Sequence, residues 1–264
     1  MPTEPDPMPG WVDTHLHLLP GLDDGPADLE QALALAEAII AEGTTRVVAT
    51  PHANYRYDYV PERAAALREQ LQAAVGERLQ ILPGCELHLS FENLQHALAS
   101  PSVYSLNRSR YLLVEFPEFF DRTALRGALE QCLQQGIVPV LAHPERNPVF
   151  QQFPASLDEY LRLGCLSQVT ASSFTGRFGK RAQQFSNELL AGERIHVVAT
   201  DAHSAQQRPP HFRRAHALIA KQAGEEIADA LCRGNPLAIT QDQPLPYEPR
   251  PTEKKKSFFA RLRG

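Results

Sequence analysis

The chain has 264 residues, 43% of them hydrophobic, and this length can bury a large core in a single domain. Its net charge of -5 combines +4 in residues 253–264 with -9 over the rest, and so acidic a body argues against a nucleic-acid-binding surface. No run of 18 apolar residues occurs, and the acidic, Pro-rich residues 1–7 differ from a secretory signal, so we expect a cytoplasmic protein.

Short β-rich segments alternate with longer helical segments from residue 11 to about residue 240, which is typical of parallel βα units. Seven strands are predicted, near Val12, Val47, Ile81, Leu113, Val140, Val169 and Val198. Helices are predicted over 29–41, 61–75, 123–135, 157–163, 180–191, 212–223 and 225–232. In the first of these helices Asp28 is the expected N-cap, and Gly43 is expected to stop the helix.

Metal-ligating side chains recur where the predicted strands end. His15 and His17 lie two residues apart, so a strand directs both to one face. Asp23 and Asp24 follow a Pro-Gly turn that can bring them back to the same place. Later strands are followed by His52, Glu86, Glu115, His143, Asp201 and His203.

This distribution of ligands favours a barrel. The carboxyl ends of the strands of a β/α barrel form one rim, so residues scattered along the chain converge there. An open, doubly wound sheet would spread the same residues along a line. We therefore predict a distorted α/β barrel of about seven parallel strands over residues 11–240.

Nine candidate ligands are too many for one ion, and the imidazole and carboxylate set suits Mn²⁺, Fe²⁺ or Zn²⁺. The set comprises His15, His17, Asp24, His52, Glu86, Glu115, His143, Asp201 and His203. Two or three ions sharing carboxylates would activate a bridging water and stabilise charge on a phosphoryl group, which predicts phosphate-ester hydrolysis. Arg146 and Arg208 are the expected phosphate ligands. The alternative is that each is a surface arginine paired with Glu145 or another acid.

Several motifs together resemble the bacterial protein tyrosine phosphatases of the PHP superfamily, which occur in capsule and exopolysaccharide loci. They are Asp13-Thr14-His15-Leu16-His17, Pro20-Gly21-Leu22-Asp23-Asp24-Gly25, Thr50-Pro51-His52, Gly84-Cys85-Glu86-Leu87, Val114-Glu115-Phe116, Ala142-His143-Pro144-Glu145-Arg146, and Thr200-Asp201-Ala202-His203 with Arg208-Pro209-Pro210. The resemblance covers residues 11–240.

This resemblance implies a distorted β/α barrel with three metal ions, usually manganese, which removes phosphate from tyrosines of a bacterial tyrosine autokinase. It implies one ion held by His15, His17, Glu86 and Asp201, a second by Glu86, Glu115 and His143, and a third by Asp24, His52, Glu115 and His203. Glu86 and Glu115 would then bridge ions, and Arg146 and Arg208 would hold the phosphate.

Three other functions compete with this interpretation. Cysteine-based phosphatase chemistry needs an arginine six residues after the cysteine, but Phe91, Val138, Ala171 and Ala238 stand six residues after the four cysteines. A histidinol-phosphate phosphatase would share most of the ligands. A non-catalytic metal-binding regulator would keep the fold, although decay would first be expected at the ligands and arginines, which are complete.

Three further segments carry expectations of their own. Residues 1–10 are expected to be flexible, and residues 241–264 to form a Pro-rich linker, extended over 243–251, followed by a basic C-terminal tail. Basic and apolar side chains are interleaved in the tail over residues 254–263. This pattern predicts either weak contact with an anionic membrane surface or a solvated tail. The segment Tyr55-Arg56-Tyr57-Asp58-Tyr59 follows His52, and it could wall an opening for an aromatic substrate or pack on the barrel rim.

Overall fold

The computed structural model describes residues 10–118 and 120–249. The predicted basic tail and residues 1–9 therefore lie outside the described residues. The described part holds nine parallel strands, which pair as two sheets in the orders β1-β2-β4 and β3-β5-β6-β7-β8-β9. These strands are β1 (Trp11–Leu16), β2 (Thr44–Ala49), β3 (His52–Ala53), β4 (Gln80–Pro83), β5 (Glu86–His88), β6 (Tyr111–Glu115), β7 (Val138–Ala142), β8 (Leu166–Thr170) and β9 (Val197–Ala199).

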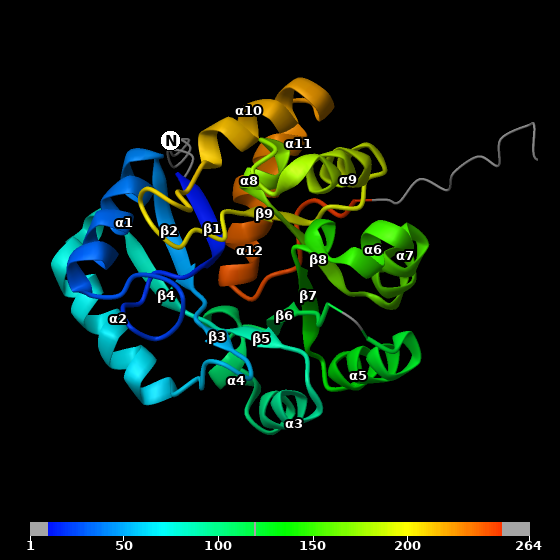
Figure 1. Cartoon of the computed structure of the whole chain (residues 1–264), viewed down its shortest axis with the longest axis horizontal. Coiled ribbons are helices and arrows are strands. Elements are labelled where there is room, and N and C mark those ends of the chain that lie inside the picture. The colour runs from blue at the N-terminus through cyan, green and yellow to red at the C-terminus, as the bar shows by residue number, and fades with distance from the viewer. Residues whose placement is uncertain (1–9, 119, 250–264) are drawn as a thin grey trace, which may run out of the picture.

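Helices surround these strands (Figure 1). They are α1 (Leu29–Ala41), α2 (Pro61–Val75), α3 (Phe91–Ala99), α4 (Pro101–Tyr104), α5 (Arg122–Gln134), α6 (Pro148–Gln152), α7 (Pro154–Leu163), α8 (Ala171–Phe174), α9 (Gly179–Ala191), α10 (Phe212–Ala223), α11 (Glu225–Asp229) and α12 (Asn235–Thr240). The predicted helix over 225–232 instead ends at Asp229 and continues as a π-helical turn over Ala230–Gly234. None of the described helices is long and apolar enough to cross a bilayer.

The predicted α/β fold is confirmed. The predicted barrel of about seven strands is corrected, because the strands pair in two sheets. The seven predicted strands all form, and β3 and β5 are additional. They contain two and three residues, and each begins shortly after a longer strand has ended, so each of these chain segments passes from one sheet to the other. An isolated parallel bridge between Leu16 and Ala202 also connects β1 to the segment that follows β9. The strands therefore do not form the single continuous ladder of the expected barrel.

Local sequence explains why α1 begins and ends where it does. The Asp28 carboxylate accepts a hydrogen bond from the Gln31 backbone N–H at 2.9 Å, which caps the first turn. Gly43 follows the helix with a φ of +88°, a conformation that costs a residue without a Cβ little. The predicted cap and stop of this helix are both confirmed.

Apolar side chains fill the space between the strands and the helices. One buried cluster includes Val48, Leu113, Val140 and Val197, which come from four different strands. Ile239 of α12 belongs to the same cluster. Because these strands are buried on both faces, their carboxyl ends have little freedom to move, and side chains placed there are held rigidly.

The Pro-rich segment after α12 has no regular secondary structure as far as Pro249, but its first part is attached to the body. The Tyr111 hydroxyl donates a hydrogen bond to the Gln243 carbonyl at 2.7 Å. Asn235 donates to the Tyr247 carbonyl at 2.8 Å and accepts from its N–H at 3.1 Å. The expected linker is therefore corrected at its start, because the chain is attached to the body at Gln243 and at Tyr247.

Candidate metal centre

The candidate ligands lie at the carboxyl ends of six strands. His15 is in β1 and His17 follows it, while His52 and Glu86 lie three residues beyond the ends of β2 and β4, where they begin the short strands β3 and β5. The other ligands of the strand ends are Glu115, which is the last residue of β6, His143, which follows β7, and Asp201 and His203, which follow β9. Asp24 lies in the loop after β1. The rim predicted from the sequence therefore gathers these side chains at one place, although the strands belong to two sheets.

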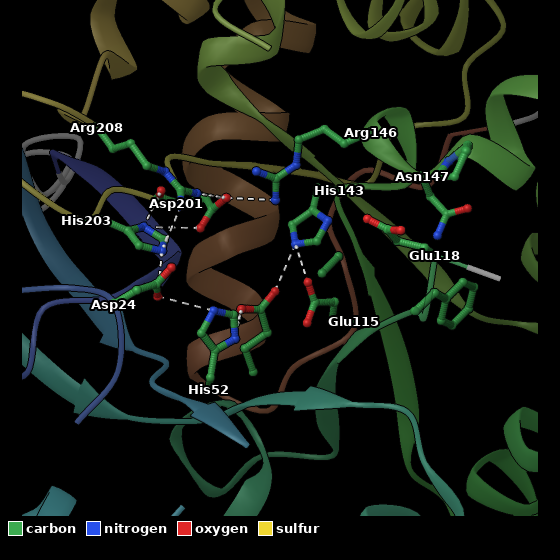
Figure 2. A pocket seen from close by; sticks show the side chains of 14 residues that line it. Asp24, His52, Glu115, Glu118, His143, Arg146, Asn147, Asp201, His203 and Arg208 are labelled. Atoms are coloured by element: carbon green, nitrogen blue, oxygen red, sulfur yellow. Dashed lines mark hydrogen bonds and ion pairs between the residues drawn. The ribbon is translucent and has the colours of Figure 1, made fainter. Parts of the chain in front are cut away.

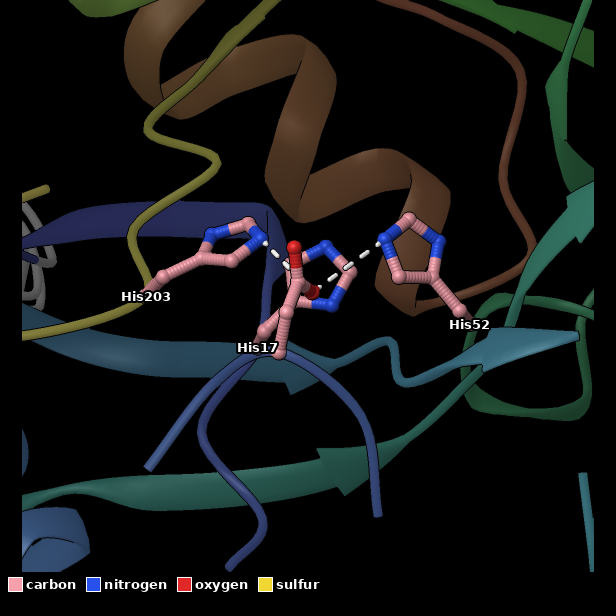
Figure 3. Close-up of side chains that lie close together, drawn as sticks. His17, His52 and His203 are labelled. Carbon is pink, nitrogen blue, oxygen red and sulfur yellow. Dashed lines mark ion pairs between the residues drawn. The ribbon is translucent and has the colours of Figure 1, made fainter. Parts of the chain in front are cut away.

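All nine candidate ligands occur in four groups whose ligand atoms lie within 4.8 Å of one another. The groups are His17, Asp24, His52 and His203; His15, His17 and Glu86; His15, His143 and Asp201; and His52, Glu86 and Glu115. Figure 3 shows the imidazoles of His17, His52 and His203 gathered around one carboxylate. The groups overlap, and Glu115 shares one with His52 and Glu86 rather than with Asp24 and His203.

Two of these residues have an unusual backbone conformation. His143 has a φ of +36° and Asp201 a φ of +52°, in the left-handed region that non-glycine residues rarely adopt. Both residues stand one or two positions beyond the end of a strand, where the chain turns sharply. Such strain persists only when the surroundings enforce it, and it is common at functional sites.

Further polar residues hold the ligands in place. The ring Nδ1 of His15 lies 2.8 Å from the Gln168 Oε1, and the ring Nδ1 of His17 lies 2.7 Å from the Asp23 Oδ2. Each of these contacts leaves the Nε2 atom directed into the cluster. Fixing one ring nitrogen in this way orients the other for a metal. Gln168 was not predicted, because it lies within a strand that reads as core.

Asp13 is a third residue that holds ligands in place, and it is fully buried. Its carboxylate accepts hydrogen bonds from the Thr200 N–H at 3.0 Å, from the Thr200 hydroxyl, and from the His15 N–H at 3.3 Å. These bonds connect β1 to the segment that follows β9. They therefore hold the His15 and His17 side of the cluster against the Asp201 and His203 side.

The cluster is strongly coupled in charge. Burial alone would lower the pKa of His15, but Glu86 and Asp201 raise that pKa above the ordinary imidazole value. Burial would likewise raise the pKa of Asp201, yet Arg146 and His15 hold it well below its usual range. Burial would also raise the pKa of Glu86, but neighbouring groups, chiefly His15, hold that pKa well below its usual range. Ionised carboxylates therefore dominate a buried site, and such a site attracts cations.

The chemistry of the donor atoms fits divalent metal ions. Among the described residues, the buried Nε2 atoms of His15 and His17, the Nδ1 of His52 and the Oε2 of Glu86 make no well-aligned hydrogen bond. Buried polar atoms without such bonds are costly. These four atoms face one another, with the His52 Nδ1 2.9 Å and the His17 Nε2 3.3 Å from the Glu86 Oε2. Metal ions bound among them would satisfy all four.

Arg146 and Arg208 line the same cavity, which has a volume of about 350 Å³ (Figure 2). Their guanidinium groups lie 2.8 Å and 2.6 Å from the same Asp201 oxygen. They also lie 4.6 Å and 5.8 Å from the centre of the Phe178 ring, so one aromatic ring contacts both cations. Glu145, the alternative partner of Arg146, is buried and instead accepts hydrogen bonds from Thr170 and Ser173.

Comparison with known proteins reveals close relatives over nearly the whole chain. The YwqE tyrosine-protein phosphatase of Bacillus subtilis is 33% identical over 255 residues, which cover 94% of this chain and 98% of YwqE. A structure described as YwqE from B. subtilis and CpsB from Streptococcus pneumoniae, unique metal-dependent tyrosine phosphatases, has a TM-score of 0.84 at 32% identity and covers 92% of this chain and 100% of its own.

A more distant structure shows only the shared fold. The histidinol phosphate phosphatase of Lactococcus lactis has a TM-score of 0.58 at 16% identity, covering 81% of this chain and 94% of its own. The family model for capsular polysaccharide synthesis proteins of the CpsB/CapC type matches residues 11–241. The resemblance found in the motifs is therefore confirmed, and the chain belongs to the CpsB/CapC family.

Proposed function

We propose that this protein is a cytoplasmic, metal-dependent protein tyrosine phosphatase, and that its substrate is a bacterial tyrosine autokinase that controls polysaccharide export. The observation that carries this proposal is the convergence of nine ligand-type side chains in one cluster, seven of which line a single cavity together with two arginines. Relatives named as tyrosine phosphatases and a family named for capsular polysaccharide synthesis support the choice of substrate.

We assign the nine residues as ligands of two or three ions, with Mn²⁺ as the main candidate and Fe²⁺ or Zn²⁺ also suited to the donors. Glu86 occurs in two of the four groups, and His15, His17 and His52 also occur in two each, so shared ligands would join neighbouring ions. When bound, such ions lower the pKa of a coordinated water and offset the charge of a phosphoryl group.

The protein's own cations would bind and orient the substrate phosphate. Arg146 and Arg208 approach Asp201 from the same cavity, and a guanidinium group can bind two phosphate oxygens at once. Asp201 and Phe178 hold both arginine side chains in position before substrate arrives, so these side chains lose little conformational freedom when the phosphate binds. The leaving group of this reaction is the tyrosine phenolate, whose conjugate acid has a pKa of about 10. It therefore needs less assistance from an acid than an alkoxide leaving group does.

The cysteines give no support to a thiolate mechanism. All four are buried, and burial raises the pKa of Cys132 to about 11 and that of Cys165 to about 12. A buried thiol with a raised pKa is a poor nucleophile.

The proposed function is tested by offering the purified protein a phosphotyrosyl peptide and histidinol phosphate, each with added Mn²⁺ and with a chelator. We expect manganese-dependent hydrolysis of the peptide and little hydrolysis of the small alkyl phosphate. Preference for histidinol phosphate would replace the proposal by that activity. Hydrolysis of neither compound by a metal-loaded, folded protein would favour a non-catalytic regulator.

A further inference from the structure

A second cavity, of about 460 Å³, lies beside the metal centre. It is lined by the loop after β3 and by the segment from β5 into α3, which lie side by side in Figure 1. Its lining includes four tyrosines and two acidic residues, which are Tyr55, Tyr57, Tyr59, Tyr104, Asp58 and Glu92. No lysine or arginine is among the residues that line it. We call it the tyrosine cavity.

Hydrogen bonds fix the walls of the tyrosine cavity. The side chain of Asn54 accepts from the N–H groups of Arg56 and Tyr57 at 2.9 Å and 3.1 Å, which closes a tight turn. Asn93 donates to the carbonyls of Ala53 and His88, both at 2.9 Å. The two sides are thus joined to each other, and the cavity is preformed.

The tyrosine cavity and the metal centre share a wall. The Tyr57 ring stacks on the His52 ring with their centres 5.9 Å apart and their planes 8° apart. His88 lines the tyrosine cavity, and its Nδ1 lies 3.5 Å from the Glu115 carboxylate of the metal centre. A substrate with its phosphate in the metal centre therefore has the tyrosine cavity directly alongside.

The lining of the tyrosine cavity is complementary to a cation. Asp58 and Glu92 are exposed, and neither makes an ion pair with any described residue. Tyrosine rings attract cations through their faces, and Tyr55, which is 84% exposed, already has the Arg56 guanidinium 5.8 Å from its ring centre. An anionic or purely apolar group would meet uncompensated carboxylates there.

We propose that the tyrosine cavity binds a lysine or arginine side chain of the substrate, close in sequence to the phosphotyrosine. This inference rests on the proposed function, and it defines the class of peptide that the site prefers. Successive residues of an extended chain lie about 3.8 Å apart, so a basic residue one to three positions from the phosphotyrosine would reach an adjoining cavity.

The test uses the manganese-loaded, full-length protein and short phosphotyrosyl peptides with Lys, Gln or Glu at each position from three before to three after the phosphotyrosine. We expect kcat/KM to be about tenfold higher for Lys than for Glu at one or two of these positions. A parallel set carries a non-hydrolysable phosphonate in place of the phosphate, and its dissociation constants should show the same preference without any turnover.

The variant Asp58→Asn with Glu92→Gln keeps the shape of the tyrosine cavity and removes its charge. We expect the preference for Lys over Glu to fall below about threefold in this double variant. Glu30→Gln is the matched control, because Glu30 is also an exposed acid in the first turn of a helix but lies in α1. It should retain the wild-type preference. Thermal unfolding checks that both proteins are folded.

Equal kcat/KM and equal binding for Lys and Glu peptides at every position would overturn the inference. An undiminished preference in the double variant would also overturn it. A protein that binds Lys phosphonates preferentially but hydrolyses no peptide would support the cavity's role and overturn the proposed phosphatase activity. A protein that neither binds nor hydrolyses any peptide would overturn both.

Discussion

Replacing Asp13 with Ala should loosen the metal centre without removing a proposed ligand. Asp13 is fully buried, and its carboxylate accepts two hydrogen bonds from Thr200 and one from the His15 N–H. Alanine would leave the Thr200 N–H and hydroxyl without this partner inside the protein. Each buried group left in this way costs about 1–3 kcal/mol, so we expect the free energy of unfolding to fall by about 2–6 kcal/mol.

The same substitution should weaken metal binding, because it releases the strand of His15 from the segment that carries Asp201. Loss of a residue that supports metal ligands typically lowers affinity by about 10- to 100-fold. Urea unfolding of chelator-treated protein measures the stability, and calorimetric titration with Mn²⁺ measures the affinity.

Thr200→Val gives the matched control, because it removes the hydroxyl and leaves the N–H bond to Asp13 in place. The double variant should be less destabilised than the sum of the single variants, by about 1.5–3 kcal/mol. The reasoning fails if Asp13→Ala lowers stability by less than about 1 kcal/mol and leaves Mn²⁺ affinity unchanged.

Three other predictions concern separate parts of the molecule. Glu115→Ala should lower both bound manganese and kcat, whereas Arg208→Ala should keep its manganese and raise KM; equal metal loss in the two, measured by elemental analysis, would contradict these roles. Phe178→Leu removes the ring that contacts both arginines and should raise KM several-fold with unchanged metal content, while Phe178→Tyr should restore the wild-type KM; identical kinetics of the Leu variant and wild type would show that the ring is dispensable. Burial lowers the pKa of His196 in the folded protein to about 4. As the pH falls below about 6.5, His196 therefore gains a proton in the unfolded state before it does so in the folded state, and the free energy of unfolding should decline by about 2–4 kcal/mol between pH 6.5 and 4. In His196→Asn this part of the decline should be missing from urea unfolding curves, and an unchanged pH profile would refute it.

The position of the metal centre could be predicted because it depends on connectivity more than on detail. Parallel strands joined by helices place their carboxyl ends at one edge, so His15 and Asp201 were expected to meet although 186 positions separate them. Their Nε2 and Oδ1 atoms lie 3.5 Å apart. The roles of the individual ligands remain predictions.

Other features depend on structure too short or too local to leave a pattern. The strands β3 and β5 contain two and three residues, and periodicity cannot be recognised over so few positions. Helix α3 was not predicted either, because it begins with the exposed Phe91, which departs from the pattern of inward-facing apolar residues. The grouping of Glu115 with His52 rather than with Asp24 depends on differences of a few ångströms, which spacing along the chain does not determine.

The central claim, that the cluster holds the metal ions needed for phosphotyrosine hydrolysis, is tested most directly by titrating the metal-free protein with Mn²⁺. Bound manganese and the rate of phosphotyrosyl-peptide hydrolysis are measured in the same samples. We predict no hydrolysis in chelator, and a rate that rises with occupancy and saturates at two or three ions per chain. Full activity in chelator, with no metal bound, would contradict the claim.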